Sequence, residues 1–132
     1  MTHAAEIHFT LCGEDFDPAE LTRLAGLRPT SIFRTPPPMA KRMKWKVSLD
    51  KVDADCINIY EMASTLVAQL QPHVAGIAHA KQELELQAVL EVVLWVAADD
   101  SACMPPIGFE PEVIAFLNEV GASIDVDMHR QV

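Results

Sequence analysis

The chain has 132 residues, half of them hydrophobic, and a formal net charge of −9. This length fits one domain, residues 1–132, and the apolar content excludes an intrinsically disordered chain. No charge-free apolar run reaches the roughly 20 residues of a membrane-spanning helix, and the acidity argues against nucleic-acid binding. The first residues lack the basic and then apolar pattern of a signal peptide, so we expect a cytoplasmic protein.

The first predicted elements are a strand and a short helix. Apolar and polar side chains alternate over residues 6–11, which predicts a strand with one buried face. Asp17, Pro18 and Glu20 then fit an N-cap, the first helical position and a capping box. The helix should end near Gly26, because glycine readily adopts the left-handed conformation that follows many helices.

Prolines dominate the next segment. Pro29 and the run at residues 36–38 predict that residues 28–42 form a long loop, with a short extended piece at residues 31–34. Residues 43–50 alternate again, and they predict a second half-buried strand.

The middle of the chain predicts two helices and the most apolar strand. Asp53 or Asp55 is expected to cap a helix that runs to Leu70, and Pro72 should interrupt it before a second helix. Residues 86–97 are apolar on both faces, which is typical of a central strand that is covered on both sides.

A three-residue motif, phenylalanine followed by an acidic residue and proline, occurs twice and marks the start of two helices. Phe16-Asp17-Pro18 opens the first helix, and Phe109-Glu110-Pro111 predicts a last helix that begins at Pro111. Each phenylalanine should pack onto the helix that it precedes, Phe16 onto Leu21 and Phe109 onto Ile114.

These elements predict the fold class. With a fourth strand at residues 124–128, the chain should form an α+β domain with a four-stranded, mainly antiparallel sheet and helices packed on one face. The expected topology is ferredoxin-like with a helical insertion between strands 2 and 3. A different α+β strand order is the main alternative.

A series of short motifs spans nearly the whole chain. They are Phe16-Asp17-Pro18-x-x-Leu21, Gly26-Leu27-x-Pro29-Thr30, Trp45-x-x-Ser48, Gly108-Phe109-x-Pro111 with Phe116-Leu117, and Ile124-Asp125-Val126-Asp127. In this order and spacing they resemble the bacterial "domain of unknown function 4279" family. The triple proline and the Lys/Arg cluster before Trp45 depart from its pattern. The resemblance implies the architecture and a bacterial cytoplasmic setting, and it implies no activity, cofactor or catalytic residue.

Cysteine and histidine spacing gives little sign of chemistry. Three widely spaced cysteines without a Cys-x-x-Cys motif predict reduced thiols. His8, Asp125, Asp127 and His129 should point away from the helices, and they would form a nitrogen–oxygen metal site only if their two strands were neighbours. A solvated strand face is the more ordinary interpretation. No Gly-x-Ser-x-Gly or Walker motif occurs, so we expect a non-catalytic protein without a cofactor.

Positive charge is concentrated in one segment. Residues 23–51 carry a net charge of +7, which leaves −16 on the rest of the chain. Arg34, Arg42, Lys44 and Lys46 are candidates to bind an anion or an acidic partner. The alternative is that these residues only keep an edge strand soluble.

The second candidate surface is apolar. Val89, Val93 and Trp95 should lie together on the face of the sheet without helices. Such a patch indicates a homodimer contact, a covering loop or the wall of a small pocket.

These features favour a protein-binding module, and its acidity suggests an immunity- or antitoxin-like factor with a basic partner. The alternative hypothesis is a small-molecule or anion-binding sensor or enzyme, with a pocket between Trp95 and the basic segment Arg28 to Lys46.

Overall fold

The computed structural model describes residues 2–39, 41–99 and 103–131. Over these residues the chain forms one sheet of six strands and four α-helices. The strands are β1 (His3–Gly13), β2 (Ser31–Arg34), β3 (Met43–Ser48), β4 (Val52–Ala54), β5 (Gln87–Ala97) and β6 (Ala122–Gln131). The helices are α1 (Pro18–Ala25), α2 (Ile59–Leu70), α3 (Val74–Glu83) and α4 (Pro111–Val120), with a 3₁₀ turn η1 (Gln71–His73) between α2 and α3.

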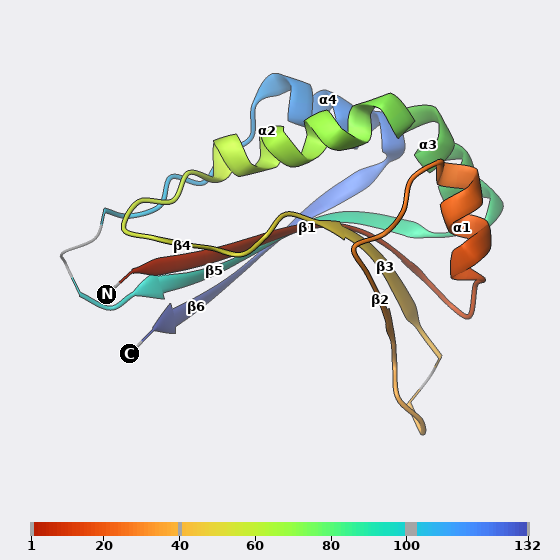
Figure 1. Cartoon of the computed structure of the whole chain (residues 1–132), viewed down its shortest axis with the longest axis horizontal. Coiled ribbons are helices and arrows are strands. Elements are labelled where there is room, and N and C mark those ends of the chain that lie inside the picture. Colours follow the sequence, from red (N-terminus) through yellow and green to blue (C-terminus); the bar gives the residue numbers. More distant parts are fainter. Residues whose placement is uncertain (1, 40, 100–102, 132) are drawn as a thin grey trace.

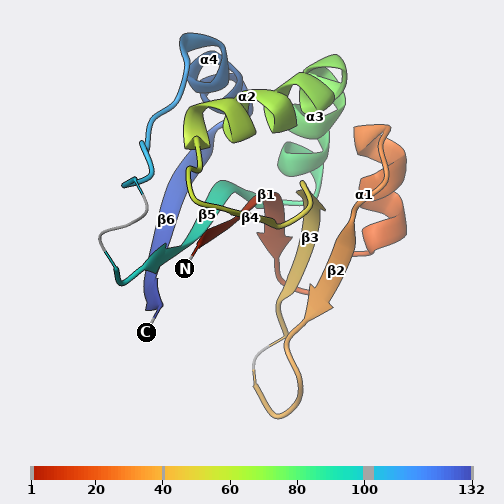
Figure 2. The ribbon, with the colours of Figure 1, turned by 60° about the vertical axis from the view of Figure 1, so that its left-hand side comes forward.

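The sheet has the order β2-β3-β1-β5-β6, and β4 pairs with the beginning of β1 beyond the end of β3. All pairs are antiparallel except β5 with β6, which run parallel through the crossover helix α4. The helices cover one face of the sheet and leave the other uncovered, as both views show (Figures 1 and 2). The α+β class and the single helical layer are therefore confirmed.

The number of strands and their topology differ from the prediction. The described residues contain six strands instead of four. The short extended piece predicted at residues 31–34 is the strand β2, paired with β3, and β4 lies where a helix cap was expected. The ferredoxin-like arrangement of the four predicted strands is not shown, since the last of them pairs in parallel beside β5. Strand pairing depends on contacts distant in the sequence, and a local alternation pattern carries no information about them.

The hydrophobic core lies between the sheet and the helices. Phe9 is fully buried at the centre of β1, and its ring packs edge-to-face on Phe116 of α4 with 5.7 Å between the ring centroids. Trp45 of β3 is also fully buried, and its indole nitrogen donates a hydrogen bond to Thr22 Oγ1 of α1 at 3.1 Å. One cluster of apolar side chains thus joins both layers.

Helix α1 begins and ends as its sequence predicts, with one difference. Asp17 accepts a hydrogen bond from the Ala19 amide, and Gly26 adopts a left-handed conformation with φ of 75°. The predicted capping box is wrong, because the Glu20 carboxylate binds the Arg23 guanidinium instead of the Asp17 amide. This hydrogen bond lowers the pKa of Glu20 below its ordinary value.

Helix α2 begins later than expected. Asn58, and neither Asp53 nor Asp55, is its N-cap, and the Asn58 side chain accepts a hydrogen bond from the Glu61 amide at 3.4 Å. Asparagine and aspartate cap helices about equally well, so the sequence alone does not choose among them. The interruption at Pro72 is confirmed by the turn η1.

Helix α4 begins at Pro111, as the repeated motif predicts. Phe16 is buried in the core, and Phe109 is half-buried against it. Ile114, the predicted partner of Phe109, is 55% exposed, so any contact between them buries little of Ile114. Among the described residues, no helix is both long enough and apolar enough to cross a lipid bilayer.

Helices α1 and α3 approach most closely at Gly76. A Cβ atom at Gly76 would lie 2.8 Å from the carbonyl oxygens of both Leu24 and Ala25. Gly76→Ala should therefore lower the free energy of unfolding by about 1–3 kcal/mol, although alanine favours a helix by about 1 kcal/mol over glycine. Urea unfolding measures this change. A stabilised Gly76→Ala protein would show that the two helices do not touch here, and Ala75→Gly is the control for propensity alone.

Candidate functional site

The most unusual surface of the protein is the outer edge of β6. Among the described strands, β6 has only one neighbour, β5, so the backbone groups along its other side are unpaired within the sheet. Ile124, Val126 and Met128 lie on the helix side of β6 and are 41%, 37% and 52% exposed. Their counterparts in β5, by contrast, are fully buried. A row of apolar side chains therefore follows the outer edge of β6. The strand itself is seen at the edge of the sheet in Figure 2.

The opposite face of β6 is acidic. Asp125 and Asp127 are both exposed and point away from the helices, in register with Glu91 and Val93 of β5. The carboxylate of Asp127 lies 3.2 Å from Nε2 of His129. The open edge thus presents three apolar side chains and then Arg130 on the helix side, and two carboxylates on the other face.

A cavity of about 720 Å³ adjoins this edge at the C-terminal ends of β5 and β6. Val96 and Met128 from the two strands line it together with Met104 from the segment after β5. Met104 is 70% exposed, and methionine side chains adapt their shape to different apolar partners. We call this cavity and the row Ile124, Val126 and Met128 the β6 groove.

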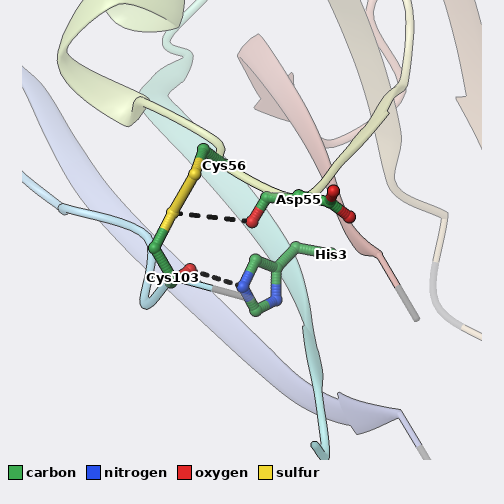
Figure 3. The surroundings of a disulfide bond; sticks show 4 residues. All are labelled: His3, Asp55, Cys56 and Cys103. Atoms are coloured by element: carbon green, nitrogen blue, oxygen red, sulfur yellow. Dashed lines mark hydrogen bonds between the residues drawn. A yellow bond between two sulfur atoms is a disulfide. The ribbon is translucent and has the colours of Figure 1, made fainter. Parts of the chain in front are cut away.

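A disulfide bond and a buried histidine hold the segment that carries Met104. Cys103 is bonded to Cys56, which lies between β4 and α2 (Figure 3). Nδ1 of His3 accepts a hydrogen bond from the Ala97 amide, so Nε2 carries the proton and donates to the Cys103 carbonyl oxygen at 2.6 Å. The disulfide and the hydrogen bond from His3 thus join Cys103 to Cys56 and to the first residue of β1. The prediction of three reduced cysteines is therefore wrong for two of them, and Cys12 is free and buried.

The predicted apolar patch on the uncovered face is only half-exposed. Val89, Val93 and Trp95 point to this face, as expected. The Trp95 ring stacks on the His129 ring with 5.7 Å between centroids, and Lys51 Nζ lies 4.5 Å from its centroid. These polar neighbours cover much of the indole, so the patch offers less apolar surface than its sequence indicates.

The centre of the uncovered face carries a network of polar side chains. His8 Nδ1 lies 2.6 Å from Ser48 Oγ, and its Nε2 lies 3.2 Å from a Glu6 carboxylate oxygen. Beside them, Thr10 donates a hydrogen bond to Glu91. These hydrogen bonds join side chains of β1, β3 and β5 across the uncovered face of the sheet.

The predicted metal ligands do not come together. His8 is on β1, whereas Asp125, Asp127 and His129 are on β6, and β5 separates the two strands. The condition for the site, that these strands are neighbours, is not met. Within residues 2–39, 41–99 and 103–131, no group of three or more His, Cys, Asp or Glu side chains could hold a metal ion.

The basic candidates are spread over both faces of the sheet. Lys44 and Lys46 point to the uncovered face, where Lys46 Nζ lies 3.7 Å from a Glu91 oxygen. Arg42 contacts the Cys12 sulfur at 4.0 Å, and Arg34 is exposed on β2. Arg42 and Lys44 thus both lie beside Cys12, and Arg34 is in register with Met43 between them in sequence.

The structure also separates Trp95 from the basic residues. Lys44 is in register with Cys12 at one end of β1, and Trp95 is in register with Ala4 at the other end. These positions are eight residues apart, or about 27 Å of strand. The pocket between Trp95 and Arg34, Arg42 or Lys44, on which the sensor hypothesis depends, is therefore not formed. The basic residue whose contact with Trp95 is seen, Lys51, lies outside the segment Arg28 to Lys46.

The sequence predicts the alternation of apolar and polar residues along β6, but it does not predict that the apolar residues are exposed. The alternation at residues 124–128 is plain, and we predicted that its apolar face would be buried. Because β6 is the edge strand, the helical layer covers it less completely than it covers β5. The alternating apolar residues of β6 are therefore exposed. No sequence pattern pointed to Met104.

Comparison with known proteins decides the family. The family described as "Domain of unknown function (DUF4279)" matches residues 3–131. The chain belongs to this family. The resemblance found in the sequence motifs is thereby confirmed. Neither the curated proteins nor the solved structures contain a match to this DUF4279 chain.

Proposed function

We propose that this DUF4279 domain is a protein-binding module that receives an extended segment of a partner protein along the open edge of β6. The observation that carries the proposal is the exposed row Ile124, Val126 and Met128 on a ten-residue strand with one neighbour. An added strand would pair with the free backbone groups, and alternate side chains would set the specificity.

The two faces of β6 define the chemistry of the partner. Side chains of an added strand alternate between the faces of the sheet. On the helix side they would meet the β6 groove, and on the other side they would meet Asp125 and Asp127. The partner segment is therefore one in which apolar residues alternate with lysine or arginine. A net charge of −9 would also speed the approach of a basic partner.

A second copy of this chain fits the same edge less well. If two β6 strands paired antiparallel around Val126, Asp125 of each copy would lie opposite Asp127 of the other. If they paired around Asp125 or Asp127, that aspartate would face itself. Like charges directly opposite in a sheet are destabilising, so self-association is disfavoured in these registers.

Two predictions from the sequence belong with this proposal. The first is an immunity- or antitoxin-like role in a bacterial cytoplasm. In that role the added strand, with its alternating lysine or arginine residues, would belong to a toxic partner that the DUF4279 domain neutralises. The homodimer through Val89, Val93 and Trp95 stays a prediction, although the polar cover of Trp95 counts against it. The sensor hypothesis has no single site that supports it.

A synthetic probe peptide tests the proposal. The probe has eight residues, alternately valine and lysine, and the control has the same composition with the four lysines grouped. We expect the probe to bind at least about tenfold more tightly than the control, and its affinity to fall with added salt because the attraction is ionic. Fluorescence anisotropy measures both.

Three results would contradict the proposal. They are equal affinity for the two peptides, equal affinity for an acidic probe with glutamate in place of lysine, and a protein that sediments as a dimer whose β6 is already occupied.

A further inference from the structure

We infer that Cys56 and Cys103 form a thiol–disulfide switch that orders Cys103 and Met104, at the start of the segment 103–110, and thereby shapes the β6 groove. The inference rests on the proposed function, because it names the regulation of the same site. It starts from the position of the disulfide, which lies beside the groove and outside the hydrophobic core.

The disulfide joins the groove to the rigid part of the molecule. Cys103 directly precedes Met104, which stands at the side of the cavity. Cys56 lies three residues before Ile59, the first residue of α2, and the Ile59 amide donates a hydrogen bond to the Pro106 carbonyl oxygen at 3.3 Å. The bond thus anchors one side of the groove to a core helix, across 47 residues of sequence.

Few other contacts hold the start of this segment, Cys103 and Met104, when the disulfide is open. The described ones are the hydrogen bond from His3 to the Cys103 carbonyl oxygen and a 3.6 Å contact between the Cys103 sulfur and the Asp55 carbonyl oxygen. Met104 is largely exposed and adds little packing. The rest of the segment has its own contacts, because Pro105 is buried, Phe109 packs against the core and the Pro106 carbonyl oxygen accepts the hydrogen bond from Ile59. A stretch with few buried contacts opens readily, so loss of the disulfide should loosen Cys103 and Met104.

Both cysteine residues are exposed, so small thiols and disulfides can reach them. Closure proceeds by exchange with a small disulfide such as oxidised glutathione. The thiolate of one cysteine attacks it and releases one glutathione thiolate. The thiolate of the second cysteine then attacks the mixed disulfide, which forms the Cys56–Cys103 bond and releases the second glutathione. The two protons of the protein thiols end on the two glutathione thiols.

The direction of the effect follows from pre-organisation. In the oxidised protein the side of the groove is fixed before binding, so binding need not order it. A reducing cytoplasm keeps exposed cysteine pairs as free thiols, and oxidation converts them to disulfides. The oxidised protein should therefore be the tight-binding form.

Hydrogen exchange and peptide binding together test the switch. The background is Cys12→Ser, which removes the third thiol, and the control adds Cys56→Ser and Cys103→Ser. Each protein is measured after oxidised glutathione and after a phosphine reductant. We expect the amides of Cys103 and Met104 to exchange at least about tenfold more slowly in the oxidised form. The probe peptide should bind at least about threefold more tightly to that form. The control should behave as the reduced protein under both conditions.

The outcomes separate the switch from the proposed function. If the probe binds both redox forms equally, or exchange is the same in both, the switch is overturned and the proposed function stands. If the probe binds neither form, the proposed function fails, and the exchange measurement still decides whether the cysteine pair orders the segment. Redox sensitivity in the control would overturn the switch as well.

Discussion

Phe9→Ala should lower the free energy of unfolding by about 4 kcal/mol. Phe9 is fully buried in β1, and its ring packs against Phe116, so removal of the ring leaves a cavity between the sheet and α4. Net stabilities of small domains are about 5–15 kcal/mol, so this one substitution would remove a large share. Urea unfolding, followed by circular dichroism, measures the change.

Phe33→Ala is the matched control. Phe33 is also a phenylalanine on a strand, but it is 54% exposed on β2. It should change the free energy of unfolding by less than about 1 kcal/mol. Similar losses for the two variants would contradict the position of the core between the sheet and the helices.

The double charge reversal Asp125→Lys with Asp127→Lys should weaken binding of the basic probe peptide by about 30-fold. Each reversal replaces an attraction across the added strand pair with a repulsion, and each change is expected to contribute about 1 kcal/mol. Both residues are exposed, so the folded state should tolerate the change. Fluorescence anisotropy measures the affinity, and a thermal melt confirms that the protein is folded.

Glu14→Lys with Glu83→Lys is the control for net charge. It makes the same change in net charge at exposed residues away from β6, one after β1 and one at the end of α3. Its effect on affinity should be small, because screening limits exposed charges to about 8 Å at physiological salt. Equal losses for the two double variants would mean that overall charge, and not the β6 edge, attracts the peptide.

Local patterns in the sequence predicted the elements well. Alternation located β1, β3 and β5, and the repeated motif located the starts of α1 and α4. Helix caps and alternation are local features of the sequence, because a cap acts within one helical turn and alternation extends over one strand. The cap of α2 was missed because Asp53, Asp55 and Asn58 are chemically similar, and β4 occupies the position of the first candidate.

Features that depend on distant contacts could not be predicted. The parallel position of β6 beside β5, the separation of β1 from β6 and the separation of Lys44 from Trp95 all follow from strand order. The bond between Cys56 and Cys103 joins residues 47 positions apart, and three cysteines give no unique pairing. The candidate site lies where these long-range features meet, and this explains why its residues other than Asp125 and Asp127 were missed.

The proposed role of β6 can be tested residue by residue by amide hydrogen exchange, with and without saturating probe peptide. A strand that pairs with β6 would protect the outward-facing amides of residues 122–131. The amides of β2, at the opposite edge, should not change. Protection confined to residues 122–131 and the neighbouring residues 103–110 is the result that we expect. Protection of β2, or of the uncovered face around His8 and Trp95, with β6 unchanged, would contradict the account.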